Sequence, residues 1–425
     1  MKFKKANFKI CVIGLGYVGL PLALALSKHF KVIGFDLNKK RINDLKSNID
    51  QTCEVSSKEL ENAINLSLTS SSQEIKASNV FIVTVPTPIT KTNVPDLRAI
   101  KHASQMLGKN LMKGSLVIYE STVYPGVTED IAAPILEKYS KLKLNKDFGL
   151  GYSPERINPG DKKHSISNIK KVISASNTHY LKITEFIYSS IIKAGLHLAP
   201  SIKVAEAAKV IENTQRDLNI ALINELSIIF SKLKIDTFDV LEAASTKWNF
   251  LPFQPGLVGG HCIGVDPYYL TFKSIEEGYY PEVVLSGRKV NDDYPVFLAK
   301  KILKTIKQAK RRYSESNVLV CGVTFKENCP DIRNTKVINL VKTLQKSKVS
   351  VDIFDPIASK SDVLLEYNVK LKQNFSGKYD VVVFAVAHSQ FKKLTKLEID
   401  KLLRKHGKIL DLKNIFPNNS KRITL

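Results

Sequence analysis

The first 200 residues alternate between short apolar runs and longer segments of helical pattern. Runs rich in β-branched residues predict strands at 8–13, 31–35, 79–85, 115–120 and 148–152. The segments between them carry apolar residues at the spacing of amphipathic helices. Strands that alternate with helices form parallel sheets through right-handed crossovers. This part of the chain therefore predicts a doubly wound α/β domain.

The middle of the chain has a different pattern. Residues 201–233 contain neither proline nor glycine and carry apolar residues at helical spacing, so they predict one long helix. Residues 247–264 crowd prolines and glycines into an apolar stretch, which indicates a loop shaped for close backbone approach. The alternation then resumes, with strands predicted at 317–322, 349–354, 379–386 and 407–412.

These patterns predict an α/β protein with two Rossmann-like, doubly wound parallel-sheet domains joined by a long-helix central domain. The boundaries are expected at 1–200, 201–312 and 313–425. A length of 425 residues agrees with two or three domains at about 150 residues each.

A glycine-rich turn follows the first predicted strand directly. It contains Gly14, Gly16, Tyr17, Val18 and Gly19, and a segment able to form a helix comes next. Glycines let such a turn close and let the backbone approach a pyrophosphate at the helix N-terminus. The turn therefore predicts a dinucleotide site, with a tight turn in some other α/β protein as the alternative.

Asp36 bears on which dinucleotide binds. It ends the second predicted strand, where a carboxylate accepts hydrogen bonds from the adenosine ribose and repels a 2′-phosphate. NAD is therefore favoured over NADP. Arg41, five residues further on, can reverse that preference by binding a phosphate, which makes it a cofactor-binding candidate as well.

Charge and cysteine content exclude several other classes of protein. The net charge of +24 arises from 64 Lys and Arg against 40 acidic residues. These basic residues are scattered without interleaved aromatics, so we expect a solvated surface and no nucleic-acid partner. The five cysteines are odd in number and form no CxxC, which predicts reduced thiols and no metal site. With neither a secretory signal nor an apolar run of about 18 residues, we expect a cytoplasmic protein without membrane insertion.

Cys262 is the candidate for covalent chemistry. It lies on a loop with Gly259, Gly260 and Gly264, so a substrate can approach it from both sides. Asp266, four residues later, can position water or accept a proton. The alternative for an isolated cysteine is a small buried apolar residue.

Further motifs, with the glycine turn and the cysteine loop, resemble the UDP-glucose/GDP-mannose dehydrogenase family over nearly the whole chain. They are Tyr119-Glu120-Ser121-Thr122-Val123, Ser153-Pro154-Glu155-Arg156, Ala205-Glu206-Ala207-Ala208-Lys209 with Asn213, and Phe325-Lys326 with Asp331-Ile332-Arg333. The resemblance implies an NAD-binding domain, a long-helix dimerisation domain and a C-terminal domain that holds the UDP-sugar. NAD as cofactor and a homodimer or higher homo-oligomer are implied with it.

The resemblance also implies a mechanism. Oxidation of an alcohol to an acid removes two hydrides, and Cys262 would hold the intermediate as a thiohemiacetal and then as a thioester, which water hydrolyses. Lys209 and Asn213, four residues apart on the long predicted helix, share one face and are assigned to the developing oxyanion. The alternative for Lys209 is a helix-surface ion pair with Glu206.

Three more residues are assigned catalytic roles by the resemblance. Asp266 would work with the lysine and an ordered water, with a turn residue before Pro267 as the alternative. Thr122 would hold the water that accepts a proton, and Glu155 would serve in thioester hydrolysis. Helix capping or loop hydrogen bonding is the alternative for these two.

Ligand contacts are also implied. The implied contacts with NAD come from the glycine turn, Asp36 and Arg41, which were named above, and also from Thr87, Thr122 and Arg333. For the sugar nucleotide, they are Glu155, Arg156, Lys209, Asn213, Gly259, Lys326 and Lys413. Lys413 stands where the family leads us to expect an arginine. Residues 318–326 begin like a second dinucleotide turn but contain only one glycine, Gly322, so no second NAD is expected there. His261 and His388 are expected to be structural.

Two departures from the UDP-glucose enzymes indicate the sugar. Pro159 stands where those enzymes carry a second glutamate, and 247–258 differs from their basic loop. Both segments resemble bacterial UDP-N-acetylhexosamine 6-dehydrogenases of surface polysaccharide (O-antigen or capsule) pathways, including the Vi-antigen type. We therefore expect oxidation of UDP-N-acetylglucosamine or UDP-N-acetylgalactosamine at C6. The alternatives are UDP-glucose or GDP-mannose oxidation, two-electron oxidation of the hydroxyacid or 6-phosphogluconate kind, and nucleic-acid binding.

Overall fold

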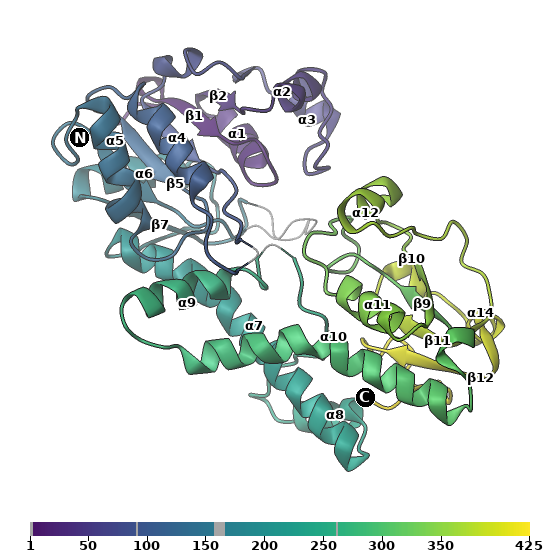
Figure 1. Ribbon diagram of the computed structural model, residues 1–425. Coiled ribbons are helices and arrows are strands. Elements are labelled where there is room, and N and C mark those ends of the chain that lie inside the picture. Colours follow the sequence, from purple (N-terminus) through teal and green to yellow (C-terminus); the bar gives the residue numbers. More distant parts are fainter. Residues whose placement is uncertain (1–2, 91, 157–165, 261) are drawn as a thin grey trace. The chain divides into compact units, whose positions relative to one another are not determined.

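The computed structural model describes residues 3–90, 92–156, 166–260 and 262–425 (Figure 1). The chain forms two compact units. Unit 1 comprises Met1–Glu212 and Tyr268–Tyr279, and unit 2 comprises Asn213–Pro267 and Tyr280–Leu425. The expectations for Pro159 and His261 lie outside the described residues.

Unit 1 is built on an eight-stranded sheet in the order β3-β2-β1-β4-β5-β6-β7-β8. The first strand, β1, lies within the sheet. Strands β2 and β3 are added on one side of it, and β4 to β8 are added on the other side. Sheets of this kind bind ligands where the strand order reverses, here between β1 and β4, at the carboxyl ends of the strands. The strands are β1 (Lys9–Ile13), β2 (Lys31–Phe35), β3 (Leu66–Thr69), β4 (Val80–Val83), β5 (Leu116–Tyr119), β6 (Gly149–Tyr152), β7 (Lys171–Ala175) and β8 (Leu196–Leu198).

Alternation along the strands divides their side chains between two helical layers. Ile10 and Val12 of β1 pack in one buried cluster with residues of α1 (Gly19–Ser27) and α6 (Thr178–Ser189). On the other face, the hydroxyl of Tyr119 lies 2.6 Å from that of Ser104 on α4 (Arg98–Gly108). The sheet is therefore covered on both faces, as expected for a doubly wound domain. The other elements are η1 (Lys5–Asn7), α2 (Lys39–Lys46), α3 (Ser57–Glu61), η2 (Glu74–Ala77), η3 (Val127–Ala132) and α5 (Ala133–Ser140).

The five strands expected in this part of the chain are confirmed, with ends that differ by a few residues. Strands β3, β7 and β8 were not expected. The expectation of parallel pairing holds except at β6 and β7, which pair antiparallel, with Tyr152 opposite Ser174. This reversal brings the first residue of β7, Lys171, next to the segment that follows β6.

Long helices form the middle of the chain. The predicted long helix is confirmed as α7 (Ile202–Leu233), followed by α8 (Thr237–Ser245), α9 (Asp266–Glu276) and α10 (Glu282–Gln308). The division between the two units falls inside α7 and inside α9. No helix in the described ranges combines the length and apolar character needed to cross a membrane.

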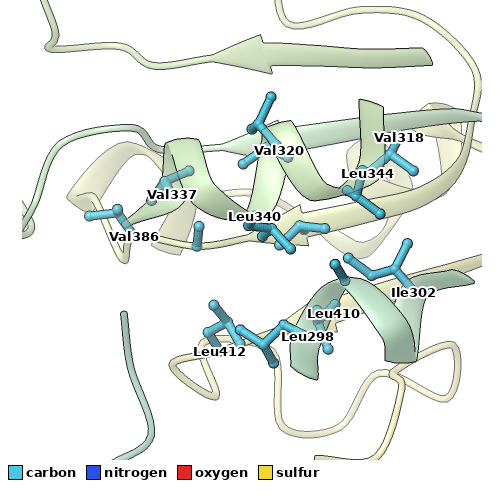
Figure 2. Close-up of a cluster of buried hydrophobic side chains, with 14 of the residues drawn as sticks. Leu298, Ile302, Val318, Val320, Val337, Leu340, Leu344, Val386, Leu410 and Leu412 are labelled. Atoms are coloured by element: carbon cyan, nitrogen blue, oxygen red, sulfur yellow. The ribbon is translucent and has the colours of Figure 1, made fainter. Parts of the chain in front are cut away.

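Unit 2 contains a smaller parallel sheet in the order β10-β9-β11-β12. Val318 and Val320 of β9 point towards α10 and α11, where they pack with Leu298, Ile302 and Leu340 (Figure 2). Leu319 and Cys321 of the same strand belong to a cluster on the opposite face. The elements are η4 (Tyr313–Glu315), β9 (Asn317–Cys321), α11 (Val337–Lys346), β10 (Ser350–Phe354), α12 (Lys360–Tyr367), β11 (Tyr379–Phe384), α13 (Ser389–Lys392), α14 (Lys396–Leu402) and β12 (Leu403–Asp411).

This arrangement confirms the predicted fold class. Both sheets open with the same backbone turn, since Gly14 after β1 and Gly322 after β9 have φ values of +91°. In each turn, the N–H of the residue after the glycine donates to an aspartate beyond the next strand. The distance is 2.9 Å to Asp36 Oδ2 in unit 1 and 2.6 Å to Asp355 Oδ2 in unit 2.

The turn in unit 2 is closed by a histidine. His388 is fully buried, and its Nδ1 accepts a hydrogen bond from the Asn328 N–H at 3.0 Å. Its Nε2 therefore carries the proton and lies 3.2 Å from Asp355 Oδ2. Burial opposes the ionised form of Asp355, but hydrogen bonds from His388 and backbone N–H groups outweigh it and lower the pKa of that carboxyl. Asp355 is thus engaged by a histidine side chain of the protein itself.

Candidate active site

The glycine turn after β1 excludes side chains at two of its glycines. A Cβ on Gly14 would lie 3.1 Å from the Thr84 carbonyl oxygen, and one on Gly19 would lie 1.8 Å from the Gly14 oxygen. A Cβ on Gly16 would meet no described atom within 4 Å. The backbone at Gly16 therefore faces open space, as a site for a pyrophosphate requires. Tyr17 and Val18, both partly buried, complete the turn before α1.

Asp36 and Arg41 both contact this turn. Asp36 accepts hydrogen bonds from the backbone N–H groups of Leu15 and Asn38, each at 2.9 Å. Arg41 donates through Nε to the Leu15 carbonyl at 2.9 Å, and its guanidinium pairs at 2.7 Å with the buried Asp50. The arginine charge is thus compensated within the protein. This weighs against a 2′-phosphate and fits NAD.

The loops after β4 and β5 are joined by hydroxyl hydrogen bonds. Thr87 Oγ1 donates to the Thr122 carbonyl at 2.7 Å, and Ser121 Oγ donates to the Val85 carbonyl at 2.7 Å. The Tyr269 hydroxyl donates to the Thr87 carbonyl at 2.8 Å. Thr87 and Thr122 therefore lie side by side at the carboxyl edge of the unit 1 sheet.

Glu206 joins α7 to the loop that follows Thr122. It is fully buried and accepts hydrogen bonds from Gly126 N–H at 2.6 Å and Thr128 N–H at 2.9 Å. Burial nevertheless raises the pKa of Glu206 to about 7. Lys209 is 8% exposed and has no hydrogen-bond or ion-pair partner within the described ranges. The helix-surface pair with Glu206 is therefore not formed, and a buried ammonium that lacks an acceptor favours an anionic ligand oxygen.

Glu155 lies in a buried ionic cluster. Lys171 Nζ is 3.3 Å from Glu155 Oε2 and 2.7 Å from Glu120 Oε2. Tyr188 donates its hydroxyl hydrogen bond to the other oxygen of Glu120. The Arg156 N–H donates to Glu155 Oε1 at 2.7 Å. Lys171 and Tyr188 were missed from the sequence because neither belongs to a recognisable motif.

Arg156 is directed towards α7. Its guanidinium pairs with Glu212, with Nε at 2.9 Å, and donates through Nη1 to the Lys170 carbonyl at 2.9 Å. Contact between Arg156 and the sugar nucleotide stays a prediction.

Unit 2 brings Cys262, Asp266 and Asn213 together. The Cys262 carbonyl accepts hydrogen bonds from Val265 N–H at 3.0 Å and Asp266 N–H at 2.8 Å, so a single tight turn joins the cysteine to the start of α9. Asp266 is 2% exposed, and its Oδ2 accepts a 2.6 Å hydrogen bond from the Asn213 amide. Cys262 is partly buried and forms no disulfide with a described cysteine. Three of the expected catalytic residues are thus positioned by one unit, while Thr122, Glu155 and Lys209 belong to unit 1.

The cysteine loop packs closely on the segment 325–336. A Cβ on Gly259 would lie 2.7 Å from the Asn334 carbonyl oxygen. A Cβ on Gly260, which has φ +83°, would lie 2.8 Å from the Phe325 ring. Glycine at these two positions therefore allows the loop to approach the segment that carries the expected ligand contacts.

Two basic residues expected to bind ligands lie in that segment. Arg333 forms an ion pair with Asp331. The Lys326 carbonyl accepts a 2.8 Å hydrogen bond from Thr324 Oγ1. Their contacts with NAD and with the sugar nucleotide stay predictions.

Two side chains hold the start of the cysteine loop. Lys413 Nζ donates to the Pro255 carbonyl at 2.9 Å, and burial lowers the pKa of Lys413. Asn224 on α7 accepts from Gly256 N–H at 2.9 Å and donates to the Gly256 carbonyl at 3.0 Å. Asn224 was missed, because an isolated asparagine within a helical pattern gives no signal. Lys413 was expected to contact the nucleotide, and that contact stays a prediction.

The chain matches known proteins domain by domain. Residues 8–192 match the NAD binding domain of the UDP-glucose/GDP-mannose dehydrogenase family, 203–293 its central domain and 319–418 its UDP binding domain. The chain belongs to this family. The resemblance inferred from the motifs and the expectation of NAD as cofactor are thereby confirmed, and the protein is an NAD-dependent nucleotide-sugar dehydrogenase.

Individual members of the family match over their full length. UDP-N-acetyl-D-glucosamine 6-dehydrogenase from Pseudomonas aeruginosa is 52% identical, over 99% of this chain and 100% of its own. The protein of the same name from Salmonella typhi is 51% identical, over 98% of each chain. A solved UDP-D-ManNAc dehydrogenase from Pyrococcus horikoshii is 29% identical, with a TM-score of 0.88 over 97% of this chain and 96% of its own.

Proposed function

We propose that this dehydrogenase oxidises the C6 alcohol of UDP-N-acetylglucosamine or UDP-N-acetylgalactosamine to the uronic acid through a thioester on Cys262. The observation that carries the proposal is the tight turn that places Cys262 beside Asp266 and Asn213. Full-length identity of 52% and 51% to two UDP-N-acetyl-D-glucosamine 6-dehydrogenases supports the choice of sugar.

Cys262 retains the sugar between the two oxidations. NAD, when bound at the glycine turn, accepts a hydride in each of them. The Cys262 thiolate forms a bond to the aldehyde carbon, and the oxygen takes up a proton to give a thiohemiacetal. Loss of that proton and of the second hydride from carbon leaves a thioester. An aldehyde held in this way cannot escape into solvent.

The remaining catalytic residues act on oxygen atoms and on water. Lys209 and Asn213 stabilise the oxyanion that develops at C6, the first as a buried cation and the second as an amide held by Asp266. Thr122 holds the water that accepts the proton of the alcohol. In hydrolysis, a water oxygen bonds to the acyl carbon, the bond to sulfur breaks, and Glu155 takes the water proton.

A panel of sugar nucleotides tests the substrate. Purified protein is assayed with NAD and each of UDP-N-acetylglucosamine, UDP-N-acetylgalactosamine, UDP-N-acetylmannosamine and UDP-glucose. We expect two NADH per uronic acid with one of the first two. Turnover confined to UDP-glucose or UDP-N-acetylmannosamine would show that the sugar is wrongly assigned, and one NADH per sugar would contradict the double oxidation.

Replacement of the cysteine tests the mechanism. Cys262→Ala is expected to abolish acid formation while NAD binding persists, because the dinucleotide turn is not altered. Cys53→Ala removes an exposed thiol from the same chain and serves as the matched control. Full activity of Cys262→Ala would favour a two-electron dehydrogenase instead.

An apolar stripe on α7 supports a homodimer. Val204, Ile211, Leu222, Ile229 and Leu233 are between 44% and 61% exposed. Their spacing of 7, 11, 7 and 4 places them on one helix face. Exposed apolar side chains that share one helix face mark an interface, and a second copy of the same helix matches it. Sedimentation of the protein is expected to give twice the chain mass, and a monomer at micromolar concentration would contradict this part of the proposal.

The proposal keeps the three-domain organisation with boundaries at 1–200, 201–312 and 313–425. One of the three family matches falls inside each range. It also places the enzyme in the cytoplasm, where it supplies an acidic sugar nucleotide for surface polysaccharide synthesis.

A further inference from the structure

A buried ion pair next to the glycine turn bears on which dinucleotide the protein can accept. Leu15 links the turn to two charged side chains through its own backbone groups. Its N–H donates to Asp36 Oδ2 and its carbonyl accepts from Arg41 Nε, each at 2.9 Å. Arg41 therefore lies close to the carboxylate that is expected to bind the adenosine ribose. A guanidinium in this place would recognise a 2′-phosphate if it were free to turn towards one.

Asp50 and its neighbour Thr52 hold this guanidinium in place. Asp50 Oδ1 lies 2.7 Å from Arg41 Nη1, and Thr52 Oγ1 lies 3.5 Å from Arg41 Nη2. The side chain of Arg41 is 10% exposed and that of Asp50 is 0% exposed. Because Nε is bound to the Leu15 carbonyl, each of the guanidinium nitrogens faces an oxygen atom of the protein. Little of its hydrogen-bonding capacity is left for a ligand.

The position of Asp50 is fixed by the loop that follows it. Its Oδ1 accepts from the N–H and the hydroxyl of Thr52, at 2.9 and 2.7 Å. Its Oδ2 accepts from the N–H groups of Glu54 and Val55, each at 3.0 Å. Burial opposes ionisation of Asp50, but hydrogen bonds from Thr52, Arg41 and the backbone outweigh it and lower the pKa of the carboxyl. Movement of Arg41 away from Asp50 would leave a buried carboxylate without its cation, which is costly.

We propose that Asp50 determines dinucleotide specificity, because it holds Arg41 against the turn and keeps this arginine from binding the 2′-phosphate of NADP. Asp36 repels that phosphate directly, whereas Asp50 withholds the cation that would compensate the repulsion. The inference goes beyond the function proposed above, since it holds whichever sugar nucleotide is oxidised and whether or not a thioester forms on Cys262. Failure of one of the two proposals therefore leaves the other standing.

Binding of the two dinucleotides to the full chain tests this role. The dissociation constants of NAD and NADP are measured by calorimetric titration, and the NADP constant is divided by the NAD constant. In Asp50→Asn, the arginine loses the anion that holds it, so this ratio is expected to fall about tenfold. Arg41→Gln in the same background removes the released cation and is expected to restore the ratio of the parent.

Two matched controls separate the release of Arg41 from a general change in charge. Asp44→Asn removes a carboxylate from α2 by the same substitution and is expected to keep the ratio of the parent. Lys40→Gln removes an exposed cation of the same helix, and in the Asp50→Asn background it is expected to keep the lowered ratio. The inference is overturned if Asp50→Asn leaves the ratio unchanged, if Asp44→Asn lowers it equally, or if the fall persists without Arg41.

Arg41→Gln in the parent decides if Asp50→Asn does not fold. A glutamine amide can still donate to the buried Asp50 carboxylate, but it carries no charge for a phosphate. An unchanged ratio is expected, because an arginine held by Asp50 makes no contact with the 2′-phosphate. A ratio that rises about tenfold would show that Arg41 already binds this phosphate in the parent, and it would overturn the inference.

Discussion

At the scale of single residues, the three glycines of the dinucleotide turn are required for different physical reasons. Gly14 needs a positive φ, Gly19 lies against backbone, and Gly16 lies against open space. The requirements for glycine at positions 14 and 19 arise within the protein itself. The open space at Gly16 therefore points to the ligand, and the motif alone does not distinguish these cases.

This difference predicts separable effects of two alanine substitutions. Gly19→Ala places a Cβ 1.8 Å from the Gly14 oxygen and is expected to cost about 1–3 kcal/mol of unfolding free energy, with loss of NAD binding. Gly16→Ala is expected to change stability by less than about 0.5 kcal/mol. Its affinity for NAD is expected to fall about tenfold or more, because the methyl occupies pyrophosphate space. Denaturant unfolding and NAD titration measure the two effects, and equal loss of stability in both variants would refute the distinction.

Residue roles could be predicted where a motif fixes both the residue and its neighbours. The glycine spacing around Cys262 and the four-residue step to Asp266 belong to one short loop, so the sequence predicts their proximity. Lys209 was open to two interpretations, and the structure removes one because the Glu206 carboxylate faces backbone N–H groups. Lys171 could not be predicted, because its importance depends on how a distant strand is paired.

At the scale of elements, three strands of the unit 1 sheet, β3, β7 and β8, were not predicted. β8 has three residues, and β7 opens with a buried lysine that looks like a surface residue in the sequence. The antiparallel pairing of β6 with β7 also breaks the rule that alternating strands and helices form parallel pairs. A pattern of hydrophobic positions carries no information on strand direction, so this feature needed the structure.

The helix α7 shapes the cysteine loop through one side chain. Asn224 makes two hydrogen bonds to Gly256 and donates a third, at 2.8 Å, to Asn291 on α10. In Asn224→Ala, we expect a loss of about 2–3 kcal/mol of unfolding free energy, since buried partners lose their hydrogen bonds. We also expect a raised KM for the sugar nucleotide, because the loop that leads to Cys262 is released.

The matched control is Asn219→Ala on the same helix. Among the residues that the structure describes, its amide donates only along α7, to the Gln215 carbonyl at 2.7 Å, so a change below about 0.5 kcal/mol is expected. Denaturant unfolding and steady-state kinetics measure both variants. Equal effects at the two positions would mean that loss of an asparagine from α7, not the contact with Gly256, is responsible.

At the scale of the whole molecule, the charge of +24 suits an enzyme whose two ligands are anionic. Basic residues spread along the chain raise the local concentration of phosphorylated ligands. Against this background, unit 1 buries two carboxyl groups whose pKa values are raised to about 7 by burial, Glu120 and Glu206. Both would have pKa values near 4.5 in the unfolded chain.

These two groups predict how stability depends on pH. Between about pH 4.5 and 7, the folded protein binds more protons at Glu120 and Glu206 than the unfolded chain does. Stability contributed by the protonated forms is complete below pH 4.5 and is lost as pH rises to 7. Each group contributes a decrease of at most about 1.4 kcal/mol per pH unit. Asp50 and Asp355, whose pKa values are lowered, affect stability only below this window.

Urea unfolding at pH 5, 6 and 7 measures this slope. The side chain introduced in Glu206→Gln cannot ionise, so the stability of this variant is expected to fall less steeply with pH over the same range than that of the parent. The variant is also expected to be less stable at pH 5, because an amide offers only one oxygen to the two N–H groups that Glu206 accepts. The change in slope, not in absolute stability, identifies the carboxyl. A variant whose slope equals that of the parent would show that Glu206 is ionised throughout this range in the folded protein.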